Sequence, residues 1–187
     1  MSVRSTVEKR ETERMSDRTF RGMTRMFQVI DFLFPYVGRR ARKFGIREGM
    51  TVVDYGCGPG RYTTRFARLV GDGGKVYAVD IHELAIEAVE RKVEKLGLKN
   101  VQPVLAQGYD SAVPDNVADV LCAIDMFWII KQPTPFLREL KRIAKPGAML
   151  IVDDPHQSRR VTRQKILDSG LWDIVEERRD HLKCRPR

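Results

Sequence analysis

The sequence has little cysteine: Cys57, Cys122 and Cys184 are the only three among 187 residues. An odd number of widely spaced cysteines differs from the disulfide framework of a small secreted domain, and it fits reduced thiols in a cytoplasm. No CxxC pair and no paired histidine and cysteine spacing is present. We therefore expect no structural zinc and no other metal site.

Long hydrophobic runs are also missing. No apolar stretch approaches the ~18 residues that a membrane-spanning helix needs. The N-terminal segment lacks the apolar core of a secretory signal, and Glu8, Glu11 and Glu13 are acidic residues that a transit peptide avoids. These absences predict a cytoplasmic protein with no membrane span.

Negative charge is scarce at both ends of the chain, whose net charge is +9. Residues 1–48 carry +6, residues 49–154 carry −1 and residues 155–187 carry +4. Basic ends fit either a solvated surface or a face turned toward an acidic substrate or nucleic acid. Nucleic-acid-binding stripes usually interleave aromatic residues, and the arginine clusters at 39–47 and 159–163 do not, so nucleic acid is not the expected partner. Nothing in the sequence indicates an oligomeric state.

The residues that are present divide the chain into three parts. Residues 1–14 are polar and charged, and we expect a disordered tail there. Residues 15–45 are expected to be helical, and residues 46–187 to form the main domain. The helical part is predicted to hold a helix from Ser16 or Asp17 to about residue 33, ended by Pro35, and a short basic helix over 39–44. The first helix has an apolar stripe at three- and four-residue steps: Phe20, Met23, Phe27, Ile30 and Phe34.

Beyond Gly49, short apolar strands alternate with helices. The predicted strands are MTVVDY, KVYAVD, NVQPVLA, ADVLCAI and AMLIVDD, and the predicted helices lie near residues 61–70, 83–97, 135–144 and 159–169. Pro146 and Gly147 are expected to end the third of these helices. WDIVEERRD and HLKC are predicted to pair as a hairpin. The alternation predicts an α/β fold, with a parallel sheet covered by helices on both faces.

Aspartates stand at or just beyond the ends of four predicted strands: Asp54, Asp80, Asp125 and Asp153. The carboxyl ends of parallel strands meet at one rim, where ligands of open α/β sheets bind. An isolated aspartate at a strand end is a common turn residue. Four on one rim favour a binding site.

The stretch VVDYGCGPG, residues 52–60, is a strand that enters a glycine turn. Its GxGxG spacing differs from the GxGxxG of dinucleotide-binding folds, because Arg61 stands where the third glycine belongs. Asp54 would repel a pyrophosphate and suits a ligand with positive charge. Asp80 lies 20 residues past Gly60, where an acid accepts hydrogen bonds from ribose hydroxyls. A nucleoside with a cationic tail, such as S-adenosylmethionine (SAM), fits this pattern.

At these residues the chain resembles the class I SAM-dependent methyltransferases. DYGCGPG followed by VYAVD is similar to motifs I and II of that family, and the later segments PDNVADVL, LKRIAKPGAMLIVDD and WDIVEERRDHLKC follow in the family's order. The resemblance covers about residues 46–185. It implies a Rossmann-like fold, with a mostly parallel seven-stranded sheet, helices on both faces and an antiparallel C-terminal hairpin. It also implies methyl transfer as the activity and SAM as the cofactor.

The resemblance implies cofactor-binding residues position by position. Motif I corresponds to Asp54, Tyr55, Gly56, Gly58 and Gly60, which would wrap the methionine part of SAM, since glycines let the backbone approach closely. Asp80 corresponds to the ribose-binding acid, and Ile81 would lie beside the adenine. Gly108 and Tyr109 occupy the family's Gly-Asp pair, so that Tyr109 stands where the adenine-binding acid is expected and Asp110 follows it. Asp125 follows the fourth strand, where the family brings methyl donor and acceptor together.

Asp125 and His156 are the candidate catalytic residues. Methyl transfer from a sulfonium mainly needs alignment in a dry pocket, and a proton acceptor is required only when the nucleophile starts protonated. His156 follows the fifth strand, at the rim; a capping role in its loop is the alternative. Asp125 could instead position the cofactor's amino group. His82 and His181 are expected at the surface.

Three functions remain open from the sequence. The first is methyl transfer to a small molecule, acidic or amphipathic in character, because the chain is compact and has no added recognition domain. In this family an element before the first strand commonly closes over the rim, so that residues 15–45 are expected to form a lid, with Phe27, Phe34, Tyr36 and Trp128 as its apolar surface. The second is methyl transfer to protein or RNA, suggested by the basic ends. The third is a SAM-binding regulator without catalysis, suggested by the missing acid at Tyr109.

Overall fold

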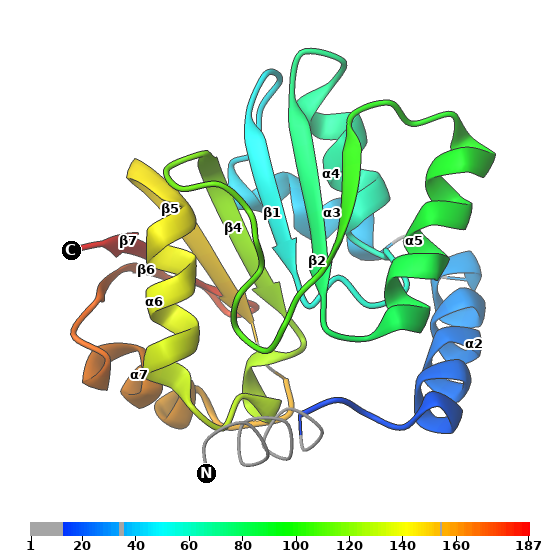
Figure 1. Cartoon of the computed structure of the whole chain (residues 1–187). Coiled ribbons are helices and arrows are strands. Elements are labelled where there is room, and N and C mark those ends of the chain that lie inside the picture. Colours follow the sequence, from blue (N-terminus) through cyan, green and yellow to red (C-terminus); the bar gives the residue numbers. More distant parts are fainter. Residues whose placement is uncertain (1–12, 34–35, 154) are drawn as a thin grey trace, which may run out of the picture.

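A seven-stranded sheet forms the centre of the computed structural model, which describes residues 13–33, 36–153 and 155–187 (Figure 1). The strand order is β3-β2-β1-β4-β5-β7-β6. β7 pairs antiparallel with both β5 and β6, and the pairs among β1 to β5 are all parallel. The strands are β1 (Thr51–Tyr55), β2 (Lys75–Asp80), β3 (Val101–Leu105), β4 (Ala118–Ile124), β5 (Ala144–Asp153), β6 (Trp172–Glu177) and β7 (Leu182–Pro186). The predicted Rossmann-like fold with a C-terminal hairpin is confirmed.

Helices cover both faces of this sheet. They are α2 (Asp17–Leu33), α3 (Tyr36–Ala41), η1 (Arg42–Phe44), α4 (Thr63–Val70), α5 (Glu83–Leu96), η2 (Phe127–Ile129), α6 (Pro133–Ile143) and α7 (Arg159–Asp168). One buried cluster joins α3, η1 and α4 to the sheet, and a second joins α6 and α7 to its other face. Figure 1 shows α6 and α7 in front of the sheet, α3 and α4 behind it, and α2 at its side.

The strands are apolar on both sides because both sides are covered. In β1, Val52 belongs to the cluster of α3 and α4 whereas its neighbour Val53 belongs to the cluster of α6 and α7. Ile151 and Val152 in β5 divide between the two clusters in the same way. Successive side chains of a strand point to opposite faces, so a continuous apolar run is what a two-sided core requires.

The connection between β3 and β4 contains no helix and is fixed by α6 instead. The Glu139 carboxylate of α6 accepts hydrogen bonds from both the backbone N–H (3.1 Å) and the hydroxyl (2.6 Å) of Ser111. Arg142, one turn on, donates to the carbonyl of Val113 at 2.8 Å and to Glu139. These polar contacts hold residues 106–117 against the sheet where a crossover helix would otherwise lie.

Two sequence expectations differ from the structure at element ends. The helix α6 ends at Ile143, and β5 begins at Ala144 and runs through Pro146 and Gly147. The pairing of β4 with β5 shifts in register here, from Ala118 opposite Ala144 to Val120 opposite Met149, so the proline, which cannot donate to a sheet ladder, lies in the irregular part of β5. Residues 1–12 of the predicted tail lie outside the described residues, and its last two residues, Glu13 and Arg14, make defined contacts. Phe34 of the predicted stripe lies outside the described residues.

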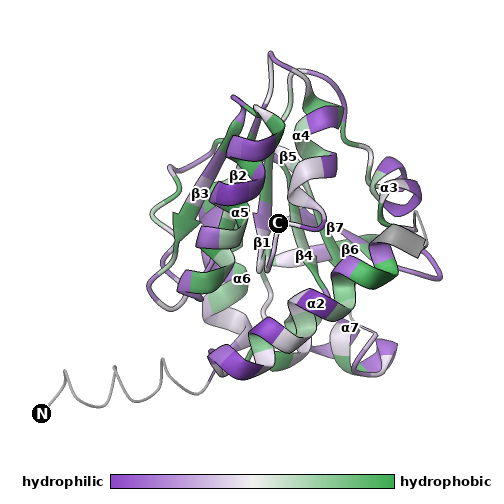
Figure 2. Cartoon of the chain, turned by 90° about the vertical axis from the view of Figure 1, so that its right-hand side faces the viewer, coloured by the Kyte–Doolittle hydropathy of each residue, from purple (hydrophilic) through white to green (hydrophobic). Residues whose placement is uncertain are grey.

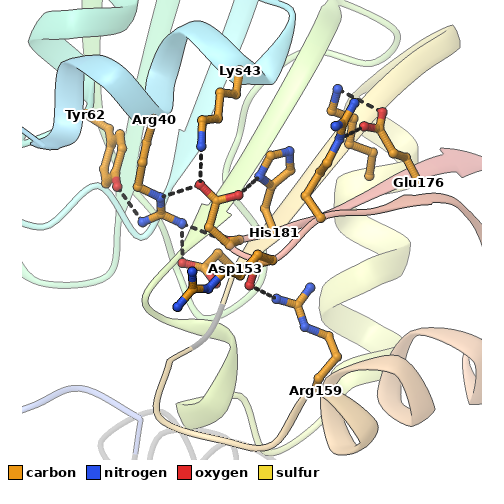
Figure 3. A network of polar contacts seen from close by, with 11 residues as sticks. Arg40, Lys43, Tyr62, Asp153, Arg159, Glu176 and His181 are labelled. Atoms are coloured by element: carbon orange, nitrogen blue, oxygen red, sulfur yellow. Dashed lines mark hydrogen bonds and ion pairs between the residues drawn. The ribbon is translucent and has the colours of Figure 1, made fainter.

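A buried arginine ties α3 to the sheet. Arg40 is only 3% exposed, and it donates to the Tyr62 hydroxyl at 2.7 Å and to the Asp180 carbonyl at 2.8 Å. It also forms an ion pair with Asp153 at the end of β5. Figure 3 shows this network, in which one guanidinium joins α3, β5 and the turn between β6 and β7. Asp153 also links this network to the candidate site, because its carbonyl accepts the N–H of Asp125 at 3.0 Å.

Candidate active site

One cavity lies at the carboxyl ends of the central strands and under α2. It brings together the predicted site residues Asp54, Tyr55, Gly56, Gly58, Asp80, Ile81, Gly108, Tyr109, Asp125 and His156. Of the predicted cofactor-binding residues, Gly60 alone does not line the cavity. Because the lining residues come from the carboxyl ends of β1 and β2 and from the loops that follow β1, β2, β3, β4 and β5, the cavity is a product of the parallel topology.

The glycine turn after β1 is fastened to β2 and has no room for a side chain at Gly56. The N–H groups of Gly56 and Cys57 both donate to the Val79 carbonyl, at 2.8 and 3.0 Å. Gly56 has a φ of +75°, and a Cβ there would lie 2.7 Å from the Met126 side chain. Glycine is therefore required at this position for both backbone conformation and space. Gly58, with a φ of +51°, borders the cavity itself.

Gly60 serves packing instead. Its φ is +75°, and an added Cβ would lie 3.1 Å from Val89 of α5. Its N–H donates to the Cys57 carbonyl at 3.0 Å, which closes the turn. Gly60 thus shapes the loop and lets α5 approach it, whereas Gly56 and Gly58 face the cavity.

Two carboxylates at neighbouring strand ends are held in different ways. Asp80 accepts the N–H groups of Gly58 and His82, both at 2.9 Å. Burial raises the pKa of Asp80, and these two donors oppose the rise. Asp54 is 2% exposed and accepts a 2.6 Å hydrogen bond from the Thr63 hydroxyl. Burial, reinforced by the charge of Asp80, raises the pKa of Asp54 to about 7.

Asp125 stands at the end of β4 in a left-handed backbone conformation, with a φ of +58°. Its N–H donates to the Asp153 carbonyl at 3.0 Å, and its own carbonyl accepts from the Trp128 indole at 3.3 Å. Burial raises the pKa of Asp125, and the charge of Asp153 adds to this effect. The unusual φ persists because neighbouring backbone and side chain hold both ends of the residue.

Trp128 and His156 lie at the mouth of the cavity. Their ring centroids are 5.3 Å apart with a tilted geometry. Trp128 is 46% exposed and His156 is exposed as well, although both line the cavity. Ile129 and Ile130 line the wall next to them. The imidazole of His156 and the aromatic surface of Trp128 thus lie together where the cavity meets solvent.

The helix α2 closes one side of the cavity with Phe20, Met23 and Phe27. Phe20 packs on the His82 ring at 4.5 Å, and the guanidinium of Arg61 lies 3.9 Å from the centroid of Phe27. Arg61 also forms a two-pronged hydrogen bond with Asp31, at 2.7 and 3.0 Å. Arg61, which stands where dinucleotide-binding folds have their third glycine, therefore holds α2 over the rim.

The sequence analysis missed the part played by Glu13. Its carboxylate accepts from the Tyr109 hydroxyl at 2.6 Å and from the Lys131 N–H at 2.8 Å. Glu13 thereby joins the loop after β3 to the segment that leads into α6, across the cavity. Asp110 does not line the cavity, and its carboxylate accepts the Ala112 N–H at 3.0 Å in a local turn. A charged tail gives no sequence signal for such a contact.

Two histidines expected at the surface are buried. His82 is 2% exposed; its ring nitrogen accepts the Leu84 N–H at 3.3 Å and so caps α5. His181 is 1% exposed and lies 3.0 Å from the Asp180 carboxylate. His82 also lines the cavity. No periodic pattern in the sequence predicts this position.

These groups fit a nucleoside with a cationic amino-acid tail. Asp80 presents a carboxylate at the position that suits sugar hydroxyls, and the turn from Gly56 to Gly58 offers backbone without side chains. Asp54 is a buried carboxylate that a positive group would stabilise in its ionised form. Among the described residues there is no group of three or more His, Cys, Asp or Glu side chains that could hold a metal ion.

Comparison with known proteins agrees with this arrangement. A family model described as "Methyltransferase domain" matches residues 46–179. The ubiquinone/menaquinone biosynthesis C-methyltransferase UbiE of Escherichia coli is 30% identical over 154 residues, which are 79% of this chain and 61% of that protein. The chain thus spans about three fifths of the length of the curated relatives it matches.

Solved structures show the same fold. A SAM-dependent methyltransferase from Aquifex aeolicus is 32% identical, with a TM-score of 0.69 and coverage of 80% of this chain and 88% of that one. A putative SAM-dependent methyltransferase from Methanococcus maripaludis has a TM-score of 0.75 at 18% identity, over 90% and 93% of the two chains. The chain therefore belongs to the class I SAM-dependent methyltransferases, and SAM is its cofactor.

Proposed function

We propose that this enzyme methylates a carbon atom of a small amphipathic molecule with a flat, apolar body. The observation that carries the proposal is the mouth of the cavity, where Trp128, Phe27 and Met23 surround an opening beside His156. The choice of carbon rests on the relative UbiE, which is named a C-methyltransferase. The basic residues near the lid suit an acceptor that carries negative charge or an ionisable hydroxyl.

The strand order indicates which end of the cavity would take the cofactor. Along the rim, β3, β2 and β1 lie side by side, followed by β4 and β5. We assign the adenine to the space beside Ile81 and Tyr109, the ribose to Asp80 and the amino-acid end to the glycine turn and Asp54. The acceptor then lies over β4 and β5, between α2 and the pair Trp128 and His156.

When bound, SAM supplies a methyl group already activated on a sulfonium. The work left to the protein is alignment and exclusion of water. In our proposal α2 and Trp128 clamp the apolar body of the acceptor, and Asp125 positions the polar end of the cofactor. A carbon acceptor has to lose a proton, and imidazole is the most common general base, so His156 is assigned this role.

The experiment uses SAM labelled in its methyl group, incubated with flat phenolic and hydroquinone-type compounds and, separately, with peptides and RNA. We expect label in the organic-extractable small molecules, and mass spectrometry should place it on carbon. Label recovered in peptide or RNA would contradict the proposal and favour the alternative acceptors. Label on oxygen or nitrogen would contradict the carbon assignment alone.

His156→Phe tests the base while keeping an aromatic ring against Trp128. We expect kcat to fall by about 10²–10⁴-fold, the usual contribution of a positioned base, with SAM affinity within about twofold of wild type. An unchanged kcat would remove His156 from the proposed chemistry.

Asp80→Ala tests the cofactor assignment. Loss of a charged hydrogen-bond partner should weaken SAM binding by about 1–3 kcal/mol, measured by calorimetry. Asp72→Ala is the matched control, because Asp72 is an exposed acid in the loop between α4 and β2. Equal affinities for the two variants would contradict the assignment of the ribose to Asp80.

A further inference from the structure

The helix α2 has an outer face that its role in the cavity does not use. Its inner residues Phe20 and Phe27 line the cavity. Further round the helix Met26 is 51% exposed, Val29 is 60% exposed and Ile30 is 37% exposed. These three are among the ten exposed bulky apolar residues of the described chain, and they lie within two turns of one helix.

Arginines flank this apolar stripe. At 100° per residue, Val29, Met26 and Ile30 span an arc of about 100°, and Arg18, Arg21 and Arg25 occupy the adjoining arc of about 60°. Figure 2 shows α2 crossing the front of the molecule, with hydrophobic and hydrophilic residues side by side along it. The apolar stripe thus lies between the arginines and the inner face, and an exposed apolar stripe with arginines along one flank is typical of helices that lie in a membrane interface.

The positive charge of this face is not neutralised within the described chain. The acids of α2 are engaged elsewhere, Asp17 with Arg14 and Asp31 with Arg61. No carboxylate of the described residues pairs with Arg18, Arg21 or Arg25. The face therefore offers three cations and three apolar side chains to the same partner.

We propose that the outer face of α2 docks on the surface of a bilayer that contains anionic lipid. Met26, Val29 and Ile30 enter the boundary between headgroups and acyl chains, and the three arginines contact lipid phosphates. The docked helix is also the wall of the acceptor cavity, so an apolar acceptor would pass from the bilayer to the mouth near Trp128. The docking itself stands without the proposed function; only this route for the acceptor rests on it.

Two other partners fit the face less well. A second copy of the chain, packed through the same stripe, would bring two sets of unpaired arginines together. Nucleic acid would use the arginines but would leave the exposed valine, methionine and isoleucine without a role. An anionic bilayer satisfies both kinds of side chain at once.

The test is co-sedimentation of the full chain with vesicles of phosphatidylcholine, with and without phosphatidylglycerol. We expect binding to the anionic vesicles that weakens strongly as salt rises to about 0.5 M, since salt screens exposed charge. Arg18→Gln/Arg21→Gln/Arg25→Gln should weaken binding by about a hundredfold, at about fivefold for each arginine. Met26→Gln/Val29→Gln should weaken it by about tenfold or more.

The matched control is Arg160→Gln/Val175→Gln, which removes an exposed arginine of α7 and an exposed valine of β6. All variants should bind SAM with unchanged affinity, which shows that they are folded. Equal binding to neutral and anionic vesicles would overturn the proposal, as would loss of binding in the control. A dimer in sedimentation velocity that Met26→Gln/Val29→Gln dissociates, or duplex DNA binding that needs only the arginines, would replace the bilayer with that partner.

Discussion

Burial of the Asp54 side chain destabilises its ionised form in the cofactor-free protein. Burial raises the pKa of Asp54 from near 4 to about 7. Between about pH 4 and pH 7 the folded state therefore keeps a proton on Asp54 that the unfolded state has lost. The contribution of Asp54 to stability therefore falls as pH rises through this window, by about 1.4 kcal/mol for each pH unit. Above pH 7 Asp54 is ionised, and its charge then serves ligand binding and not the stability of the fold.

This leads to a prediction for Asp54→Asn, which keeps a hydrogen-bond acceptor for Thr63. Relative to wild type, the free energy of unfolding of the cofactor-free variant should rise steadily between about pH 4 and pH 7, and SAM should bind more weakly. Urea unfolding at several pH values and calorimetry measure the two effects. Asp72→Asn, at an exposed position, should show neither. A stability difference that does not vary with pH would refute this account of Asp54.

At the residue scale, local sequence predicted which residues line the cavity where one segment carries both fold and chemistry. Gly56 and Gly58 after β1 and Asp80 at the end of β2 follow from strand-end spacing, and all three line the cavity. Glu13 and His82 could not be predicted, because their positions depend on contacts with Tyr109 and Phe20, which come from distant segments. The roles assigned to these residues remain predictions until variants are measured.

At the element scale, α3 is held by a buried guanidinium as well as by the apolar cluster that includes Val37 and Ala41. Arg40 has partners on the loop before α4, on β5 and on the β6–β7 turn, so this one side chain ties a six-residue helix to three other parts of the fold. Breaking one side of a buried ion pair is costly because the remaining charge stays buried without compensation.

We therefore expect Arg40→Met to lower the free energy of unfolding by about 3–5 kcal/mol. Urea denaturation followed through the buried Trp172 gives the measurement. Arg39→Met, its exposed neighbour on the same helix, should change stability by less than about 0.5 kcal/mol. If the two substitutions cost the same, the network does not anchor α3.

Element prediction succeeded where periodicity was strong and failed where tertiary contacts decided. The apolar strands and the helix α5 match their predicted ranges closely, since both patterns repeat over several residues. Pro146 and Gly147 are usual helix stops, yet they lie inside β5, in the stretch between Ala144 and Met149 where the pairing with β4 shifts in register. The connection from β3 to β4 also depends on tertiary contacts. It contains no helix, and Glu139 and Arg142 of α6, which comes later in the chain, hold it by hydrogen bonds.

At the scale of the whole molecule, the cavity joins segments from Glu13 to His156, so the cofactor should bind the folded state and not the unfolded one. At a free SAM concentration of about 100 times Kd, the stability should rise by about 2.7 kcal/mol. For a chain of this size that raises Tm by about 5–10 °C, as measured by differential scanning fluorimetry. Asp80→Ala at the same SAM concentration should show a smaller rise. An equal rise in the variant would mean that SAM stabilises the protein from another position.

Among the described residues no helix is both long and apolar enough to cross a bilayer. The proposed docking of the outer face of α2 would place a bilayer surface beside the acceptor cavity.

The order in which the sheet closes follows from the place of β7 between β5 and β6. During synthesis β6 emerges before β7, yet its hydrogen-bonding partner in the sheet is β7. Until residues 182–186 have left the ribosome, β5 keeps an open edge and β6 has nothing to pair with. A nascent chain stalled just before this point would expose two unsatisfied strands, and it would be a natural target for chaperones that recognise them.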